Sequence, residues 1–192
     1  MHYESLQGHF WYLNAKLNSH AVNLRRRANP QITESSMGNF LWGPHALCMP
    51  KEIDLSCMVS KLREAIMKIN ADFVKDLQGD GGFSKLYELM KGKIIALSSI
   101  ECSSGMNYIA FTSWCNFGFY DIDFGWGKPM WVSYVGSSND LETVFVNIII
   151  LMDTRSGDGI EAWVTLDQED MTMLAQDKEL LDFASFDPSP IK

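Results

Sequence analysis

The chain has 192 residues, which is enough for one ordinary domain or two small ones with a proper buried core. Hydrophobic residues make up 46% of it and charged residues 21%, a composition that is typical of globular proteins and argues against disorder. The net charge of −8 would repel a phosphate backbone, so a nucleic-acid partner is not expected.

A short β-prone segment, residues 19–24, leads into the only basic run, residues 25–27. Three arginines are too few for a nucleic-acid footprint, and we interpret them as a solvated strand end with one arginine in an ion pair. The polar stretch that follows contains Pro30, Gly38 and Asn39, and it is typical of a loop.

From Asp54 onward the pattern becomes helical. Apolar residues recur every three or four positions with charged residues between them, which predicts an amphipathic helix with Asp54 as its N-cap. The repeating apolar positions are Leu55, Val59, Leu62, Ile66, Ile69, Phe73 and Leu77. The GDGG of residues 79–82 is expected to end this helix. A second, shorter helix is expected from Phe83 to Met90, ending at Gly92.

The second half of the chain is predicted to be mostly β. Segments rich in β-branched and aromatic residues lie at 108–114, 130–135, 143–152 and 160–166. We expect the last two to form a hairpin closed by residues 157–159. Asp167 then caps a final helix that begins at Gln168. Together these elements predict an α/β fold, a mixed β-sheet with helices on one face.

Several classes of site are not expected. Four cysteines without a CxxC spacing suit reduced thiols in a cytosolic core. His45 and Cys48 form a lone H-x-x-C pair, which offers too few ligands for zinc, so no metal is expected. The start of the chain does not have the pattern of a signal peptide, and the apolar run near residues 143–152 is too short to cross a bilayer. The sequence therefore predicts a soluble, cytoplasmic protein that does not bind a membrane.

The segment FTSWCNFGFYDIDFGWGKP, residues 111–129, resembles the C-terminal half of the BAHD acyltransferases. These plant enzymes transfer acyl groups from coenzyme A to alcohols or amines, and DFGWG is their signature pentapeptide. Three further stretches are similar in the same order: AVNLRRRANPQITESSMGN, LMDTRSGDGIEAWVTL and DMTMLAQDKELLDFASFDPS. The branch that the chain most resembles, of the vinorine synthase type, acetylates alkaloids and other specialised metabolites.

The resemblance implies a domain division and a fold. It runs from about Ser19 to the C-terminus, so residues 1–18 are an unmatched segment and residues 19–192 a BAHD C-terminal-type domain. Such a domain is one chloramphenicol acetyltransferase-like half of a two-domain enzyme. The family's other signature, H-x-x-x-D, provides the general base in the N-terminal half, and none of the four histidines in this sequence has an aspartate four residues later.

The resemblance assigns the DFGWG pentapeptide a structural role. Its aspartate, Asp123, is expected to pair with Arg25, while its two glycines allow a sharp corner and its two aromatic rings plug that corner from opposite sides. The residues of this corner are Arg25, Asp123, Phe124, Gly125, Trp126 and Gly127. We expect a corner that holds the fold near the coenzyme channel rather than a catalytic element.

The resemblance places the chemistry on the T-S-W run. Thr112 and Trp114 are expected to support the oxyanion of the tetrahedral intermediate and to face the channel, with Ser113 pointing away because strand side chains alternate. For Trp114, packing in the core is an alternative of nearly equal weight. Gly38 and Asn39 match a family loop near the pantetheine arm. The implied co-substrates are an acyl-CoA, expected to be acetyl-CoA, and a small alcohol, with no permanently bound cofactor.

Three functions stay open at this point. The chain is expected to be one half of an acyl-CoA-dependent O-acyltransferase, inactive without an H-x-x-x-D half. The alternatives are a catalytically dead domain that binds acyl-CoA or a partner enzyme, and a gene remnant. The sequence alone leaves open whether it is a natural short protein, a truncated gene copy or an incomplete gene model.

Overall fold

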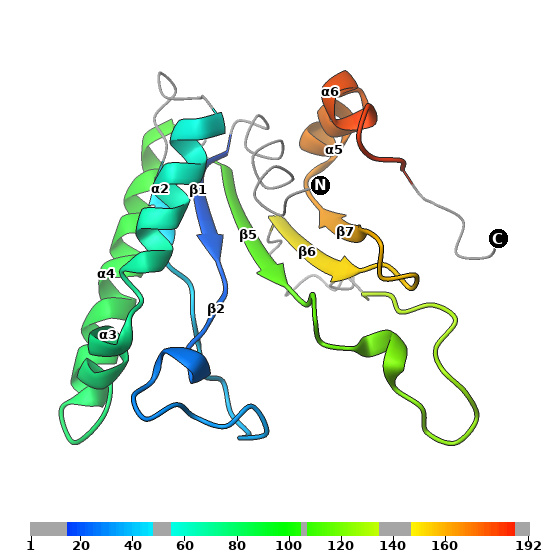
Figure 1. Cartoon of the computed structure of the whole chain (residues 1–192). Helices are drawn as coiled ribbons and strands as arrows, with labels where there is room; N and C mark the ends of the chain where they lie inside the picture. Colours follow the sequence, from blue (N-terminus) through cyan, green and yellow to red (C-terminus); the bar gives the residue numbers. More distant parts are fainter. Residues whose placement is uncertain (1–14, 48–54, 105–106, 135–146, 187–192) are drawn as a thin grey trace, which may run out of the picture. The chain divides into compact units, whose positions relative to one another are not determined.

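The computed structural model describes residues 15–47, 55–104, 107–134 and 147–186 (Figure 1). Asn14–Tyr108 form one compact unit, and the chain from Ile109 onward supplies the described part of a second.

The described residues of the first unit contain four short strands in two antiparallel pairs. They are β1 (Ala15–His20), β2 (Val22–Asn23), β3 (Leu41–Trp42) and β4 (His45–Leu47). β1 pairs with β4, and β2 pairs with β3. The predicted strand at residues 19–24 is therefore divided between β1 and β2. The arginine run that follows is a short 3-10 turn, Arg25–Arg27.

Three helices belong to the same unit: α2 (Leu55–Met67), α3 (Ala71–Asp76) and α4 (Gly82–Ser104). The prediction of one continuous helix up to residues 79–82 was wrong, because the helix ends at Met67 and a new one begins at Ala71. Asn70 begins α3 by accepting a hydrogen bond from the Phe73 amide at 3.0 Å. An asparagine side chain competes in this way with the backbone and favours a new helix start over continuation. The predicted N-cap, Asp54, lies outside the described residues.

The expected end of the second helix at Gly92 was also wrong, since α4 continues to Ser104. One glycine in a helix interior costs only ~0.5–1 kcal/mol relative to alanine, which is too little to stop a helix that is stabilised elsewhere. Lys93, one residue on, donates a hydrogen bond to the Gly43 carbonyl oxygen at 2.6 Å, and its ammonium lies 3.7 Å from the centre of the Trp42 ring. α2 and α4 lie on the same side of β1 (Figure 1). Among the described helices, none is both long and apolar enough to span a membrane.

The second unit is a mixed sheet followed by helices (Figure 1). Its strands are β5 (Asn107–Ser113, of which the part from Ile109 belongs to this unit), β6 (Asn147–Asp153) and β7 (Ile160–Thr165), and its helices are α5 (Gln168–Ala175) and α6 (Lys178–Leu181). β5 runs parallel to β6, and β6 runs antiparallel to β7. The predicted mixed sheet with helices is confirmed, as are the strands at 108–114 and 160–166 and the β6–β7 hairpin. Residues 143–146 of the expected third strand lie outside the described chain.

The cap of α5 is also confirmed, because the Asp167 carboxylate accepts a hydrogen bond from the Asp170 amide at 2.8 Å. α6, which was not predicted, begins in the same way: Asp177 accepts from the Leu180 amide at 3.1 Å. The strand expected at 130–135 was wrong, since the described residues 130–134 are irregular. Their backbone makes a side-chain contact instead, in which the Val132 amide donates to the Tyr120 hydroxyl at 3.4 Å.

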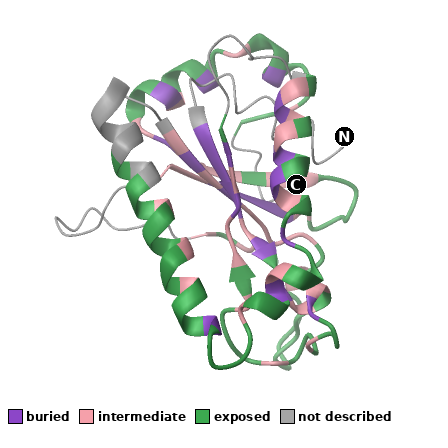
Figure 2. Ribbon diagram, turned by 90° about the vertical axis from the view of Figure 1, so that its left-hand side faces the viewer, coloured by how far each residue is buried: buried purple, intermediate pink, exposed green. Residues whose placement is uncertain are grey.

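β6 lies at the centre of the described core of its unit. Its residues 149–152 are each at most 1% exposed, although neighbouring residues on a strand point to opposite faces. Both faces of β6 are therefore covered, as is typical of a strand with a parallel neighbour. The buried positions concentrate in the strands, whereas the helices are exposed along much of their surface (Figure 2).

Candidate functional site

Thr112 lies on β5, one residue before the strand ends. In the parallel ladder it stands opposite Ile150 of β6. Ile109 and Phe111 are 0% and 4% exposed, whereas Thr112 is half-buried. Alternation places Thr112 on the opposite face of the strand from Ile109 and Phe111, the face that it shares with its register partner Ile150.

Trp114 extends the strand and is held by aromatic neighbours. Its backbone amide donates to the Leu151 carbonyl oxygen at 2.8 Å, which continues the β6 ladder by one residue. Its ring meets Phe119 and Tyr134 edge-to-face, at 5.8 and 6.0 Å between ring centres. Such pairs are worth roughly 0.5–1.5 kcal/mol each beyond the area they bury. The indole is therefore fixed in position, as both a packing role and a channel-wall role require.

An open pocket of about 400 Å³ adjoins Trp114 in the second unit. Its lining consists of Trp114, Asn116, Gly118, Phe119, Tyr120, Asp121, Lys128, Met152, Asp153, Thr154, Arg155 and Gly157. Asn116 has a positive φ of 64°, and its amide donates to the Asp153 carboxylate at 2.6 Å. Lys128 pairs with Asp121 at 2.8 Å and thereby lowers the pKa of that carboxyl. The pocket wall is thus aromatic with charges of both signs.

The DFGWG corner turns around its own aspartate. The Asp123 carboxylate accepts hydrogen bonds from the amides of Gly125 at 2.7 Å and Gly127 at 3.0 Å, and these bonds lower the pKa of Asp123. The two glycines have φ angles of 101° and 107°, a region that other residues rarely adopt.

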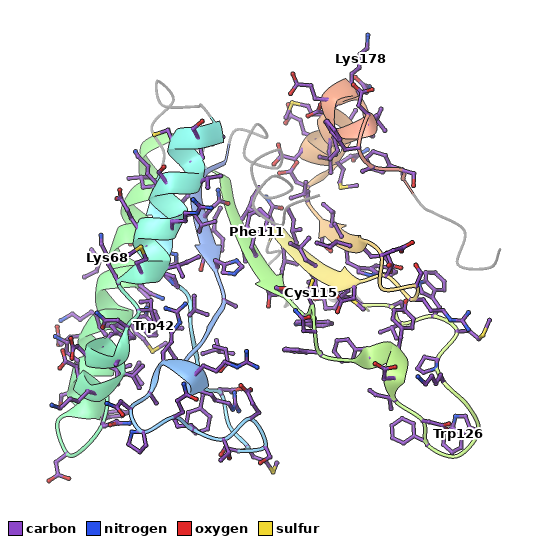
Figure 3. All side chains as sticks on the ribbon, viewed as in Figure 1. Trp42, Lys68, Phe111, Cys115, Trp126 and Lys178 are labelled. Atoms are coloured by element: carbon purple, nitrogen blue, oxygen red, sulfur yellow. The ribbon has the colours of Figure 1, made fainter. Side chains whose placement is uncertain are left out.

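The two aromatic side chains were expected to plug the corner from opposite sides, and this expectation was wrong. Phe124 and Trp126 pack against each other at 5.7 Å between ring centres, and they are 73% and 84% exposed. Trp126 stands at the tip of the loop (Figure 3). The loop therefore presents two large apolar rings to its surroundings.

Arg25 organises the loop that holds Gly38 in the first unit. Its Nη2 donates to the carbonyl oxygens of Ser36 at 2.7 Å and Gly38 at 2.9 Å, and its guanidinium lies 4.9 Å from the centre of the Phe40 ring. Gly38 has a φ of 130°, and a Cβ there would lie 3.0 Å from that ring. Asn39, which stands between Gly38 and Phe40, is exposed. The Arg25–Asp123 pair stays a prediction, because the two residues belong to different units and each has its described partners in its own.

Two of the four histidines lie in the described chain, and both belong to the first unit. Burial lowers the pKa of His20 to about 4. Burial and, to a smaller extent, the Lys93 charge lower the pKa of His45 to about 4 as well. Because the best general base has a pKa near the operating pH, neither imidazole is tuned to accept a proton at neutral pH.

Phe119 and Tyr134, which complete the surroundings of Trp114, were not predicted from the sequence. Tyr134 and Phe119 carry no local signal of a contact with Trp114, since the contacts arise only when the chain folds back. Asn116 did carry one, because asparagine tolerates a left-handed backbone better than most residues and it stands two positions before a glycine.

A family model described as "Transferase family" matches residues 9–181. Two relatives are an epi-neemfruitin B 7-O-acetyltransferase from Melia azedarach, 52% identical over 97% of this chain, and a limonoid 7-O-acetyltransferase from Citrus sinensis, 54% identical over 91%. The chain covers 40% and 37% of these two proteins, so it spans about two fifths of their length.

Two solved structures are similar to the chain. Vinorine synthase is 30% identical with a TM-score of 0.57, over 88% of this chain and 38% of that one. F. sporotrichioides TRI101, complexed with coenzyme A and T-2, is 18% identical with a TM-score of 0.63, over 95% of this chain and 44% of that one. Both show that the fold is the chloramphenicol acetyltransferase-like fold. The chain belongs to the Transferase family, that of the BAHD acyltransferases.

Proposed function

We propose that this chain supplies the Thr112 side of the active site of an acetyl-CoA-dependent O-acetyltransferase, whose acceptor is a hydroxyl group of a plant limonoid. One observation carries the proposal: the likeness to two 7-O-acetyltransferases extends over nine tenths or more of the chain. The half-buried Thr112, on the face of β5 opposite the buried Ile109 and Phe111, supports it, as does the fixed Trp114 ring two residues further on.

In the proposed reaction the acceptor oxygen attacks the thioester carbonyl and the acceptor proton passes to a base. The C–S bond then breaks, and the departing thiolate takes that proton from the base and leaves as the coenzyme A thiol. The Thr112 hydroxyl donates a hydrogen bond to the oxyanion of the tetrahedral intermediate. Trp114, held by Phe119 and Tyr134, forms the wall beside it. Gly38 and Asn39 border the pantetheine arm, on a loop whose shape Arg25 maintains.

The base is proposed to come from an H-x-x-x-D segment outside these 192 residues. Within them, the described histidines His20 and His45 have pKa values of about 4 and suit that role poorly. General base catalysis typically contributes ~10²–10⁴-fold. We therefore propose that the 192 residues acting alone give no turnover above background.

The test is acetyl transfer from radiolabelled acetyl-CoA to a limonoid with a free 7-hydroxyl group. The chain is assayed alone and after fusion to the N-terminal part of the Citrus sinensis relative. We expect turnover only in the fusion, and a fall of ~10²–10³-fold in kcat when Thr112→Ala removes the donor. Thr172→Ala is the matched control, because the Thr172 hydroxyl is exposed on α5 and donates to the Gln168 carbonyl oxygen.

Two results would contradict the proposal. A fusion that folds and binds acetyl-CoA but transfers nothing to any limonoid would favour a binding domain without catalysis. An active fusion that Thr112→Ala leaves unchanged would remove Thr112 from the site while keeping the assigned activity.

A further inference from the structure

The open pocket beside Trp114 lies where β5 and β6 end. The two strands run parallel and end at the same edge of the sheet (Figure 1). The pocket of about 400 Å³ is lined by residues that follow both strands, among them Trp114 and Asn116 after β5, and Thr154 and Arg155 after β6. The carboxyl ends of parallel strands are where small ligands bind in open α/β sheets. The place of the pocket in the fold therefore points to a small-molecule site.

The rim of this pocket is fixed by contacts within the chain. Asn116 and Gly118 have positive φ angles of 64° and 66°, so the chain curves tightly after β5. The Asn116 amide donates to the Asp153 carboxylate at 2.6 Å, which ties this curve to the end of β6. On another side of the pocket, Lys128 pairs with Asp121 at 2.8 Å. Because the rim is formed in advance, a ligand loses little free energy to ordering it.

The charges of the pocket wall cancel. Asp121 and Lys128 neutralise each other, and Asp153 stands two residues before Arg155. An anion would therefore meet carboxylates as well as cations, and a cation would meet cations as well as carboxylates. The wall favours neither sign of charge, yet each of its charged groups can donate or accept hydrogen bonds. This balance favours a neutral ligand with many polar groups.

Three polar groups of the wall have the capacity to bind such a ligand. Arg155 is exposed and has no ion-pair or hydrogen-bond partner among the described residues, so its guanidinium N–H groups can donate. The Tyr120 hydroxyl accepts from the Val132 amide at 3.4 Å and can donate its own hydrogen. The Asp153 carboxylate has further lone pairs besides the one that Asn116 uses. Donors and acceptors therefore line the same pocket.

Aromatic rings supply the apolar part of the wall. Trp114 and Phe119 both line the pocket, and their edge-to-face contact at 5.8 Å between ring centres fixes both rings. The negative π face of an aromatic ring attracts the C–H groups of a saturated ring. A pyranose sugar has C–H groups on its faces and hydroxyl groups around its edge, and every hydroxyl both donates and accepts. We propose that this pocket binds a neutral pyranose ring.

The proposed sugar site is independent of the proposed acetyl transfer, apart from the Trp114 ring that the two share. The pocket is open and a single sugar ring is small, so we expect a Kd of about 1–10 mM. Sugar binding requires neither acetyl-CoA nor an H-x-x-x-D segment. It can therefore be measured on the 192-residue chain by itself, whether or not the chain takes part in acetyl transfer.

The first experiment titrates the chain with methyl β-glucopyranoside up to about 50 mM, a range that brackets the expected Kd. The readout is the indole N–H signal of Trp114 in ¹H–¹⁵N spectra, which is assigned with Trp114→Phe. We expect a saturable shift, and an affinity about fivefold or more weaker in Arg155→Met, which keeps an apolar side chain but loses the donors. Arg26→Met is the matched control, because Arg26 is an exposed arginine of the first unit that pairs with Glu34. Unchanged indole signals of Trp42 and Trp163 show that each variant is folded.

The second experiment changes the charge and polarity of the ligand. Methyl β-glucuronide carries a carboxylate on the same ring, and cyclohexanol keeps a six-membered ring with one hydroxyl. Both should bind about threefold or more weakly than the glucoside. A titration without a saturable shift overturns the proposal. So does tighter binding of the glucuronide, which would make the pocket an anion site, or tighter binding of cyclohexanol, which would make it an apolar site. Equal affinities for Arg155→Met and Arg26→Met would also overturn it.

Discussion

Arg27 donates a hydrogen bond from Nη1 to the backbone carbonyl oxygen of Ile69 at 2.6 Å, and a second from the same atom to Ile66 at 3.2 Å. The last carbonyls of a helix have no partner within it, and a cation there also offsets the helix dipole. Arg27 therefore ties the turn after β2 to the end of α2, which corrects the interpretation of the arginine run as a solvated strand end. The one ion pair that this interpretation expected is present, between Arg26 and Glu34.

We expect Arg27→Met to lower the free energy of unfolding by ~1.5–3 kcal/mol, because two carbonyls lose a charged donor. Arg26→Met is the matched control. Arg26 pairs with Glu34 at 2.6 Å, but both side chains are more than half exposed, and such pairs contribute only ~0–1 kcal/mol. Urea unfolding of both variants makes the comparison. Equal losses would show that the helix end does not depend on Arg27.

Gly127→Ala should destabilise the second unit. At a φ of 107° an alanine Cβ is strained, although no atom lies within 4 Å of its position. The expected cost is ~1–2 kcal/mol, and it comes from the backbone rather than from a clash. Gly92→Ala is the opposite case, since Gly92 lies inside α4 with open space around it, and it should stabilise by ~0.5–1 kcal/mol. Thermal unfolding of the two variants should therefore shift in opposite directions.

His45 should make stability fall on acidification. Its folded pKa of about 4 lies below the unfolded value of 6.5, so the unfolded state binds more protons between these two values. Stability is then lost as the pH falls from 6.5 toward 4, by at most ~3 kcal/mol and by less where solvent screens the ring.

The non-titrating variant His45→Gln should lose less stability than the parent across this window. The measurement is the free energy of unfolding at intervals between pH 7 and pH 4. Parallel curves for parent and variant would mean that His45 is not the group that titrates.

The predicted Arg25–Asp123 pair can be tested by a double-mutant cycle. If the two residues couple, Arg25→Met and Asp123→Asn together should destabilise by less than the sum of the single changes. Asn keeps an oxygen that can accept from the Gly125 and Gly127 amides, so the cycle isolates the charge. Additive losses would show that the two residues do not interact, and that Asp123 stabilises only the turn within its own loop.

Local chemistry explains which elements could be predicted from the sequence. β7 and the helix cap at Asp167 depend on alternation and on one side chain, and both were predicted. The break before Asn70 was missed because the apolar spacing continues through it to Phe73, whereas a cap is decided by one hydrogen bond. The end of α4 was missed because a glycine lowers helix propensity without forbidding a helix.

In the candidate site too, local features could be predicted from the sequence and long-range contacts could not. Thr112 and Trp114 were assigned through a motif that is contiguous in sequence, and the strand they belong to was predicted. The contact between the rings of Tyr134 and Trp114 was not predicted. It joins two residues that are far apart in the sequence, so it depends on the path of the intervening chain. Patterns that repeat every two or four residues carry no information about that path.

The parallel pairing of β5 with β6 has a consequence for the order of assembly. β6 and β7 are joined by residues 154–159 only, so that hairpin can form locally and early. β5 can join β6 only after residues 114–146 have been closed into a loop, and the entropy of that closure is lost before any contact is gained. We therefore expect the strand that carries Thr112 to join β6 late, onto a hairpin that is already formed.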